Sequence, residues 1–94
     1  MSSSHWAALA EQARRLAVLA EESAARDPRA LAPTGDADPF GEMMRLAAED
    51  LAAQVRACRN ATWRKLRAEG ATLAEIAALW GVSIAAVSKA LQKG

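Results

Sequence analysis

Apolar residues recur at helical spacing in three stretches of the chain. In residues 6–20 and again in residues 40–66 they return every three or four positions, which is the pattern of one face of an amphipathic helix. The positions are Trp6, Leu9, Ala13, Leu16 and Ala20 in the first stretch, and Phe40, Met44, Ala47, Leu51, Val55, Cys58, Thr62 and Leu66 in the second. A third stretch, residues 72–91, is interrupted at Gly81. The pattern predicts a chain built from helices.

The first predicted helix is followed by a segment rich in proline and glycine. Ser4 is a suitable N-cap, and we expect residues 1–26 to form an amphipathic arm that packs or dimerises, because a helix with so short a stripe is marginal alone. All three prolines and two of the five glycines fall in residues 27–41, which indicates an ordered turn or a flexible linker. Asp38 before Pro39 is a suitable start for the next helix.

Residues 42–69 continue the second helical pattern without a breaking residue and carry basic side chains near the end. Gly70 then provides the residue type that most often terminates a helix. A helix of roughly 30 residues exceeds the ordinary length of about 11–12. Two interpretations stay open: a long dimerising strut, or a helix that breaks around Asn60.

Composition agrees with an all-α fold. The 94 residues include 25 alanines but only one Phe, three Trp and no Tyr, and alanine is the best helix former. Cys58 is the only cysteine, which excludes an intrachain disulfide, and His5 has no second metal ligand at a useful spacing. No glycine-rich phosphate loop and no nucleophile–base set is present. We therefore expect no cofactor, no metal site and no enzymatic activity.

The sequence also bears on location and source. A lone thiol fits a reducing cytoplasm, and neither a targeting segment nor an apolar run of membrane-spanning length is found. We expect a cytoplasmic protein without a membrane or a small-molecule effector as partner. Nine Arg against three Lys, together with the alanine excess, indicate a GC-rich bacterial or phage genome.

Charge divides the chain into two unlike halves, although the net charge is only +1. Residues 1–54 carry a balance of −4, whereas residues 55–94 carry +5. An acidic half joined to a basic half favours a module that binds a polyanion and carries a separate arm.

The segment from residue 70 to residue 94 predicts two short helices joined by a turn. Thr72 and Glu75 have the spacing of a capping box, Gly81 suits a left-handed turn, and Ser83 is a cap for the second helix. The expected inner positions are Ile76, Leu79 and Trp80 in the first helix, Val82 in the corner, and Val87, Ala90 and Leu91 in the second. Two short helices with a glycine-containing turn are typical of a helix-turn-helix.

Residues 72–91 resemble the DNA-binding helix-turn-helix of bacterial repressors, especially the lactose-repressor family and phage Cro-type repressors. They are also similar to the last helices of sigma-factor region four and of resolvases. The matched positions are Ala77, Trp80, Gly81, Val82, Val87 and Ala90. The resemblance implies that the second helix enters the major groove of double-stranded DNA. It covers about a third of the chain and says nothing of the first 55 residues.

The resemblance and the charge pattern together define a set of candidate DNA contacts. Hydroxyl groups at the two helix starts suit phosphate oxygens, Lys89 suits a guanine edge or a phosphate, and Gln92 suits an adenine. The full set is Thr72, Ser83, Ile84, Ala85, Ser88, Lys89 and Gln92, with Arg59, Arg64 and Lys65 on the preceding helix as phosphate contacts.

One departure from the resemblance leaves an alternative open. Ile84 and Ala85 stand where long polar readers usually stand, so base contacts are few and one copy would discriminate poorly between sequences. We therefore expect a homodimer, formed through the N-terminal and long helices, that presents two recognition helices at the ~34 Å repeat of the duplex. The alternative is a protein-interaction module that binds a partner such as a sigma factor or a segregation factor through this apolar patch.

Overall fold

The computed structural model describes residues 2–92. Met1, Lys93 and Gly94 lie outside the described residues, so the predicted units 1–26 and 70–94 are described only up to those limits. The elements in chain order are α1 (Ser2–Ala25), a 3₁₀ helix η1 (Pro28–Leu31), α2 (Pro39–Ala68), α3 (Leu73–Trp80) and α4 (Ile84–Gln92). No strand occurs within residues 2–92, which confirms the all-α fold.

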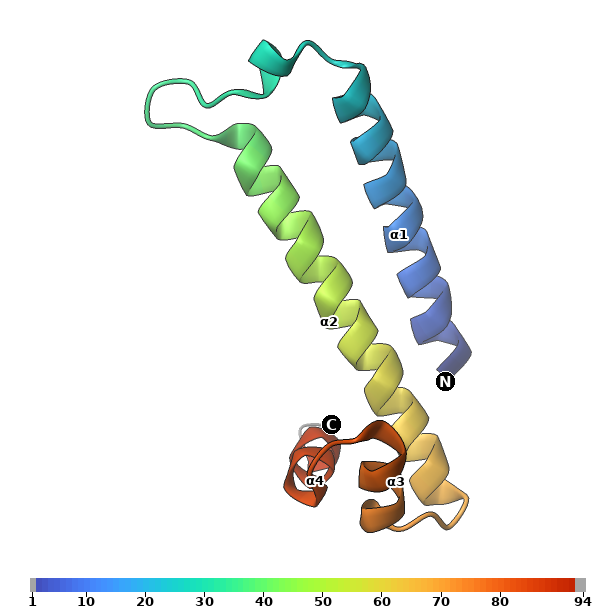
Figure 1. Ribbon diagram of the computed structural model, residues 1–94. Coiled ribbons are helices and arrows are strands. Elements are labelled where there is room, and N and C mark those ends of the chain that lie inside the picture. Colours follow the sequence, from blue (N-terminus) through green and yellow to red (C-terminus); the bar gives the residue numbers. More distant parts are fainter. Residues whose placement is uncertain (1, 93–94) are drawn as a thin grey trace.

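The helices form an elongated molecule with a small globular end (Figure 1). Helices α1 and α2 run antiparallel as a hairpin, and α3 and α4 pack against the C-terminal end of α2. The molecule measures 54 × 26 × 21 Å and has a radius of gyration of 18.1 Å. A compact domain of this length would have a radius of gyration of about 12–13 Å. The hairpin therefore stands out from the globular end as an arm.

Helix α2 is continuous over 30 residues, so the break considered around Asn60 does not occur. It begins at Pro39, and its first turn includes residues 39–41, which the sequence placed in the linker. The Asp38 carboxylate caps this start by accepting a hydrogen bond from the Gly41 N–H at 3.0 Å. The other end closes at Gly70, where φ is +102° and the Ala71 N–H donates to the Leu66 carbonyl.

Two predictions for α1 were wrong in detail. The helix begins at Ser2, so Ser4 lies inside it and is not its N-cap. The half-buried side follows Leu9, Leu16 and Leu19, whereas Trp6 and the alanines of the predicted stripe are exposed. Leucine side chains reach across the helix pair to α2 and alanine side chains do not, so the contact follows the leucines. The predicted stripe of α2 is half-buried or buried throughout except at Val55, which is exposed.

The segment between the hairpin helices is ordered. Asp27 caps the 3₁₀ helix by accepting from the Arg29 N–H at 2.9 Å, and Thr34 and Ala37 form an isolated antiparallel bridge around Gly35. Of the two interpretations for residues 27–41, the structure has the ordered turn.

The buried core lies at the globular end. Trp63, Ile76, Ala77 and Val87 form one cluster from three helices, and Trp63 is only 1% exposed. Two inner-face predictions were wrong, because Leu79 is 72% exposed and Val82 is 39% exposed. A third was right only in part, because Trp80 contacts Trp63 but is itself 41% exposed. Because α3 has only eight residues, its single inner face is already occupied by Ile76 and Ala77. Leu79 therefore lies on the side that no other element covers.

Candidate nucleic-acid interface

The turn between α3 and α4 fixes the direction of α4 relative to α3. Gly81 adopts φ +66°, in the left-handed region that suits glycine, and the Val82 N–H closes the end of α3 by donating to the Ala77 carbonyl at 3.0 Å. The Ser83 hydroxyl then caps α4 by accepting from the Ala86 N–H at 3.0 Å. The two helices are bent by 111° relative to each other.

A complete capping box fixes the start of α3. The Glu75 N–H donates to the Thr72 hydroxyl at 3.1 Å, and the Thr72 N–H donates to the Glu75 carboxylate at 3.0 Å. The hydrogen bond from the Thr72 backbone, followed by that of its side chain, lowers the pKa of Glu75 below its ordinary value of 4.5. Thr72 is thereby held at the α3 N-terminus, where the sequence placed a phosphate contact.

Helix α4 turns one side inward and leaves the other open. Val87 is fully buried in the core, with Ala90 and Leu91 packed partly against it. Of the candidate contacts on and before this helix, Ser88 is half-buried and the others are exposed: Ser83, Ile84, Ala85, Lys89 and Gln92. The outward side of α4 therefore carries the apolar side chains of Ile84 and Ala85 at its start and polar side chains farther along.

A groove between α2 and α4 brings basic side chains of both helices together. It has a volume of about 320 Å³, and its lining includes Arg56, Arg59, Asn60 and Lys89, with two alanines of α4 as its floor. Arg59 and Lys89 belong to the candidate set, whereas Arg56 and Asn60 were missed. Arg56 stands three positions before Arg59 and so shares its side of the helix. Asn60, the next residue after Arg59, is turned away by about 100° and is joined to it through the guanidinium hydrogen bonds. The side of α2 that carries Arg59 becomes part of a groove only because α4 packs next to it.

The Arg59 side chain is held in place by two neighbours. Its guanidinium lies over the Trp63 ring, 4.4 Å from the ring centroid. Its Nε and Nη2 groups also donate to the Asn60 side-chain oxygen at 3.2 and 3.0 Å. A planar guanidinium held on one face and along one edge has a restricted orientation before any ligand binds.

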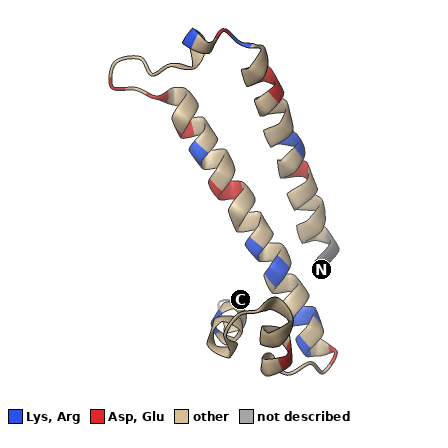
Figure 2. Cartoon of the chain, viewed as in Figure 1, with Lys and Arg blue, Asp and Glu red and all other residues tan. Residues whose placement is uncertain are grey.

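The ion pairs lie in a different part of the molecule from the basic residues of the second half of the chain. Within residues 2–92 the ion pairs involve only residues 11–49, where Arg14, Arg15, Arg29 and Arg45 each meet a carboxylate. The basic residues of the second half, from Arg56 to Lys89, form no ion pair with any described residue. Figure 2 shows acidic and basic residues mixed along α1 and the upper part of α2, whereas the lower part of α2 carries mainly basic ones. The charge asymmetry of the sequence is therefore also an asymmetry in space.

The other predicted phosphate contacts are not brought to the groove. Lys65 is exposed and lies two residues beyond Trp63, about 200° around the helix, and therefore on the opposite side of α2 from α3 and α4. Arg64 is exposed on the flank, about 100° from Trp63. Arg67, which was not in the set, donates to the Ala71 carbonyl at 2.8 Å and so holds the connection from α2 to α3.

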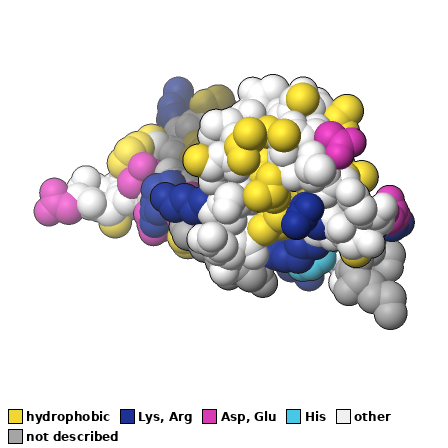
Figure 3. Space-filling model, turned by 90° about the horizontal axis from the view of Figure 1, so that it is seen from below, with side chains coloured by type: hydrophobic (Ala, Val, Ile, Leu, Met, Phe, Trp, Pro, Cys, Tyr) yellow, Lys and Arg dark blue, Asp and Glu magenta, His cyan; other side chains and the backbone are white. Residues whose placement is uncertain are grey.

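An apolar patch lies at the α3–α4 turn. Leu79, Trp80, Val82 and Ile84 are all exposed, and Ile84 is 51% exposed. Figure 3 shows hydrophobic side chains gathered on this end of the molecule with basic side chains beside them. We call Leu79, Val82 and Ile84 the turn patch, because Trp80 also contacts the core. No acidic side chain belongs to it.

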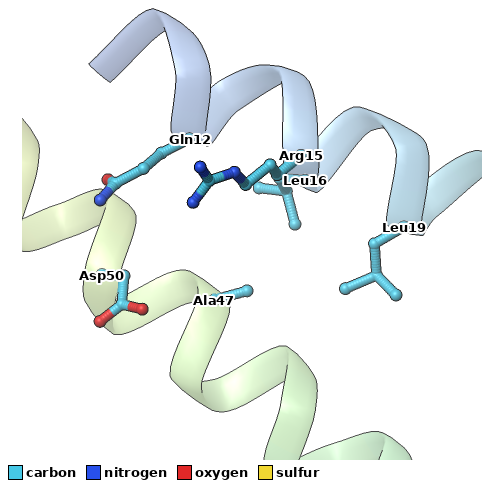
Figure 4. Close-up of a pocket in the computed structure, with 6 residues that line it drawn as sticks. All are labelled: Gln12, Arg15, Leu16, Leu19, Ala47 and Asp50. Atoms are coloured by element: carbon cyan, nitrogen blue, oxygen red, sulfur yellow. The ribbon is translucent and has the colours of Figure 1, made fainter. Parts of the chain in front are cut away.

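The hairpin contains a second, smaller hollow of about 160 Å³ between α1 and α2. Figure 4 shows Gln12, Arg15, Leu16 and Leu19 of α1 facing Ala47 and Asp50 of α2 around it. Alanine opposite leucine leaves part of the space between the helices unfilled. Arg15 pairs with Glu11 of its own helix, and within the described residues no ion pair joins it to Asp50 across the hollow.

Within residues 2–92, no group of three or more His, Cys, Asp or Glu side chains is placed to hold a metal ion. No single helix in that range has both the length and the apolar character to cross a membrane, and only the bent pair of α3 and α4 reaches this character jointly. No protein-family model, curated protein or solved structure matches the chain.

Proposed function

We propose that this chain is a small DNA-binding protein that acts as a homodimer and places α4 in the major groove of duplex DNA. In this proposal α3, the Gly81 turn and α4 form a helix-turn-helix, and the protein is a bacterial or phage regulator of transcription. The observation that carries the proposal is the 111° bend between the two helices with the outer side of α4 exposed. A bend of about 90–120° and a short glycine-containing turn are typical of this motif.

The electrostatic surroundings of α4 support a polyanionic ligand. Arg56 and Arg59 lie beside α4 and Lys89 lies on it, and none of the three forms an ion pair with a described residue. Surface ion pairs contribute little to stability. Lys and Arg side chains that neutralise phosphates release the counterions condensed on the DNA, and this release supplies most of the affinity of sequence-independent DNA binding.

Direct readout of bases would be limited. The outer side of α4 offers Ser88, Lys89 and Gln92 as hydrogen-bonding groups, while Ile84 and Ala85 suit only apolar contact with a thymine methyl. Each good bidentate contact discriminates by about 1–3 kcal/mol. We therefore infer that selectivity depends on two half-sites and on DNA shape more than on one recognition helix.

The hairpin is the part of the chain that we assign to dimerisation. The chain exposes 6626 Å² of surface, whereas a compact monomer of 9.9 kDa is expected to expose about 5,200 Å². The excess is roughly 1,400 Å². In an interface of ordinary size each partner buries about 800 Å², so the excess is large enough for one. Along α1 an uncharged stripe of exposed residues is available for it: Trp6, Ala10, Ala13, Ala17 and Ala20. We call this the arm stripe.

A salt titration tests the DNA-binding proposal. Fluorescence anisotropy with a labelled duplex should give an affinity that falls steeply between about 50 and about 300 mM salt, with a slope set by the number of phosphates contacted. The double variant Arg59→Glu/Lys89→Glu should abolish binding at the lower salt concentration. Wild-type affinity that does not change over this range would contradict phosphate contacts.

The turn patch favours a second candidate function, a protein-interaction module on the same scaffold. Leu79, Val82 and Ile84 are exposed together, and their burial against a partner would be favourable. Two variants separate the candidates. If the effect of the protein in cells survives Arg59→Glu/Lys89→Glu but is lost with Ile84→Asp, the chain acts through a protein partner. If that effect is lost with the double variant but survives Ile84→Asp, DNA binding is supported.

A further inference from the structure

We propose that the groove between α2 and α4 binds one backbone phosphodiester of the duplex, with the guanidinium of Arg59 as its fixed centre and Arg56 and Lys89 as its two sides. This inference rests on the proposed DNA-binding function and adds residues to it. It makes the long helix a direct part of the DNA-binding surface, so that two helices would hold the strand that borders the major groove.

The side chain of Arg59 is already ordered for binding an anion. An arginine that is free in solution loses side-chain conformational entropy when it binds a phosphate. Here the Trp63 ring, itself only 1% exposed, supports one face of the guanidinium at 4.4 Å, and Asn60 accepts two of its N–H groups. Much of that ordering is therefore already made in the free protein, which favours tighter binding.

The lining of the groove indicates which class of ligand it binds. Among the described residues, three cations and one amide line the groove together with two alanines, and none of these six carries a carboxylate. Such a site favours a strongly charged acceptor of hydrogen bonds over a neutral or cationic ligand. Phosphate oxygens match the fork of N–H donors of an arginine, and a flanking lysine adds a point charge.

Trp63 has a role in the groove as well as in the core. Trp63 packs with Ile76 and Val87 of α3 and α4, while its ring also supports Arg59. The same indole therefore sets the orientation of α4 and the position of the guanidinium beside it. Trp63 is in this sense a positioning residue, and Arg59 is the group that we expect to touch the phosphate.

The experiment compares salt slopes of single variants. Arg56→Ala, Arg59→Ala and Lys89→Ala are titrated with the same labelled duplex as the wild type, and Lys65→Ala is the matched control, because it removes an exposed charge from the far side of α2. Each lost phosphate contact should reduce the slope of log affinity against log salt by about 1. We expect that reduction for Arg59→Ala, smaller reductions for the two flanking variants, and essentially the wild-type slope for Lys65→Ala.

A conservative variant separates fixed geometry from charge alone. Arg59→Lys keeps the charge but removes the planar group on the Trp63 ring, so it should keep most of the salt slope and still bind several-fold more weakly than the wild type. Circular dichroism melting curves show whether each variant remains folded. Wild-type affinity in Arg59→Lys would contradict the role of the stacked guanidinium.

The outcomes distinguish this inference from the function on which it rests. If the wild type binds DNA and Lys65→Ala lowers the slope as much as Arg59→Ala does, the groove is not a phosphate site, although the proposed function stands. If the wild type shows no salt-dependent binding, the function itself is wrong and the groove assignment is overturned with it.

Discussion

The rings of Trp63 and Trp80 meet in a T-shaped contact, with centroids 5.9 Å apart and ring planes at 87°. Trp63 is buried in α2, and Trp80 is the last residue of α3, so the contact joins the end of α3 to the long helix immediately before the chain turns into α4. Trp80 is 41% exposed, so it covers the core without being enclosed by it.

Loss of this ring should destabilise the globular end. Trp80→Ala removes a T-shaped pair and the area that the ring covers, and we expect it to lower the free energy of unfolding by about 2 kcal/mol. Trp80→Phe should cost less than half as much. Leu79→Ala, at the neighbouring but 72% exposed position, should change it by no more than about 0.5 kcal/mol. Urea unfolding monitored by circular dichroism measures all three.

The turn should depend on its left-handed residue. An added Cβ at Gly81 meets no atom within 4 Å, so the cost of Gly81→Ala comes from its φ of +66° alone. We expect about 1–2 kcal/mol of destabilisation. Gly81→Asn should cost less, because asparagine tolerates this conformation better. Equal stability of the alanine variant and the wild type in the same urea assay would show that a Cβ at this position carries no conformational cost, contrary to the left-handed turn.

The capping box should make stability depend on pH in a defined window. Because the folded-state pKa of Glu75 is lowered, its contribution is present above the ordinary value of 4.5 and is lost as the pH falls through the lowered pKa. Glu75→Gln keeps the hydrogen-bonding shape without the charge. Thermal melts should show wild type more stable than the variant at neutral pH and the difference vanishing in acid below that window. A difference that stays constant with pH would exclude this linkage.

The arm stripe should control the oligomeric state. Ala13→Glu places a charge at the centre of the proposed interface, and sedimentation equilibrium should show a shift from dimer to monomer. Val18→Glu is the control, because Val18 is exposed on another side of α1 and should leave the dimer intact. Retention of the dimer mass by the Ala13 variant would show that copies associate elsewhere.

The sequence predicted those features that depend on neighbouring residues. The cap of Asp38, the capping box of Thr72 and Glu75, and the left-handed turn at Gly81 all follow from residue types at fixed short spacings. The side on which each helix is buried was harder to predict, because it depends on which helix lies opposite. Trp6 and Leu79 have apolar side chains and both are exposed in this chain.

The groove was accessible to sequence reasoning only in part. Arg59 and Lys89 were recognised as basic residues near the motif, but their common groove depends on the angle at which α4 returns to α2. That angle is set by long-range packing of Val87 against Trp63, which no local spacing encodes. The same packing places Lys65 on the far side, so basic residues close in sequence are divided between two surfaces.

The most direct test of the central claim is a map of the DNA-bound surface. Backbone amide chemical shifts of the isotope-labelled protein should be recorded during titration with a duplex. The account predicts the largest changes in residues 83–92 and at Arg56 and Arg59, with little change along α1. Changes concentrated on α1, or none at a duplex excess that saturates binding, would contradict the placement of α4 in the groove of DNA.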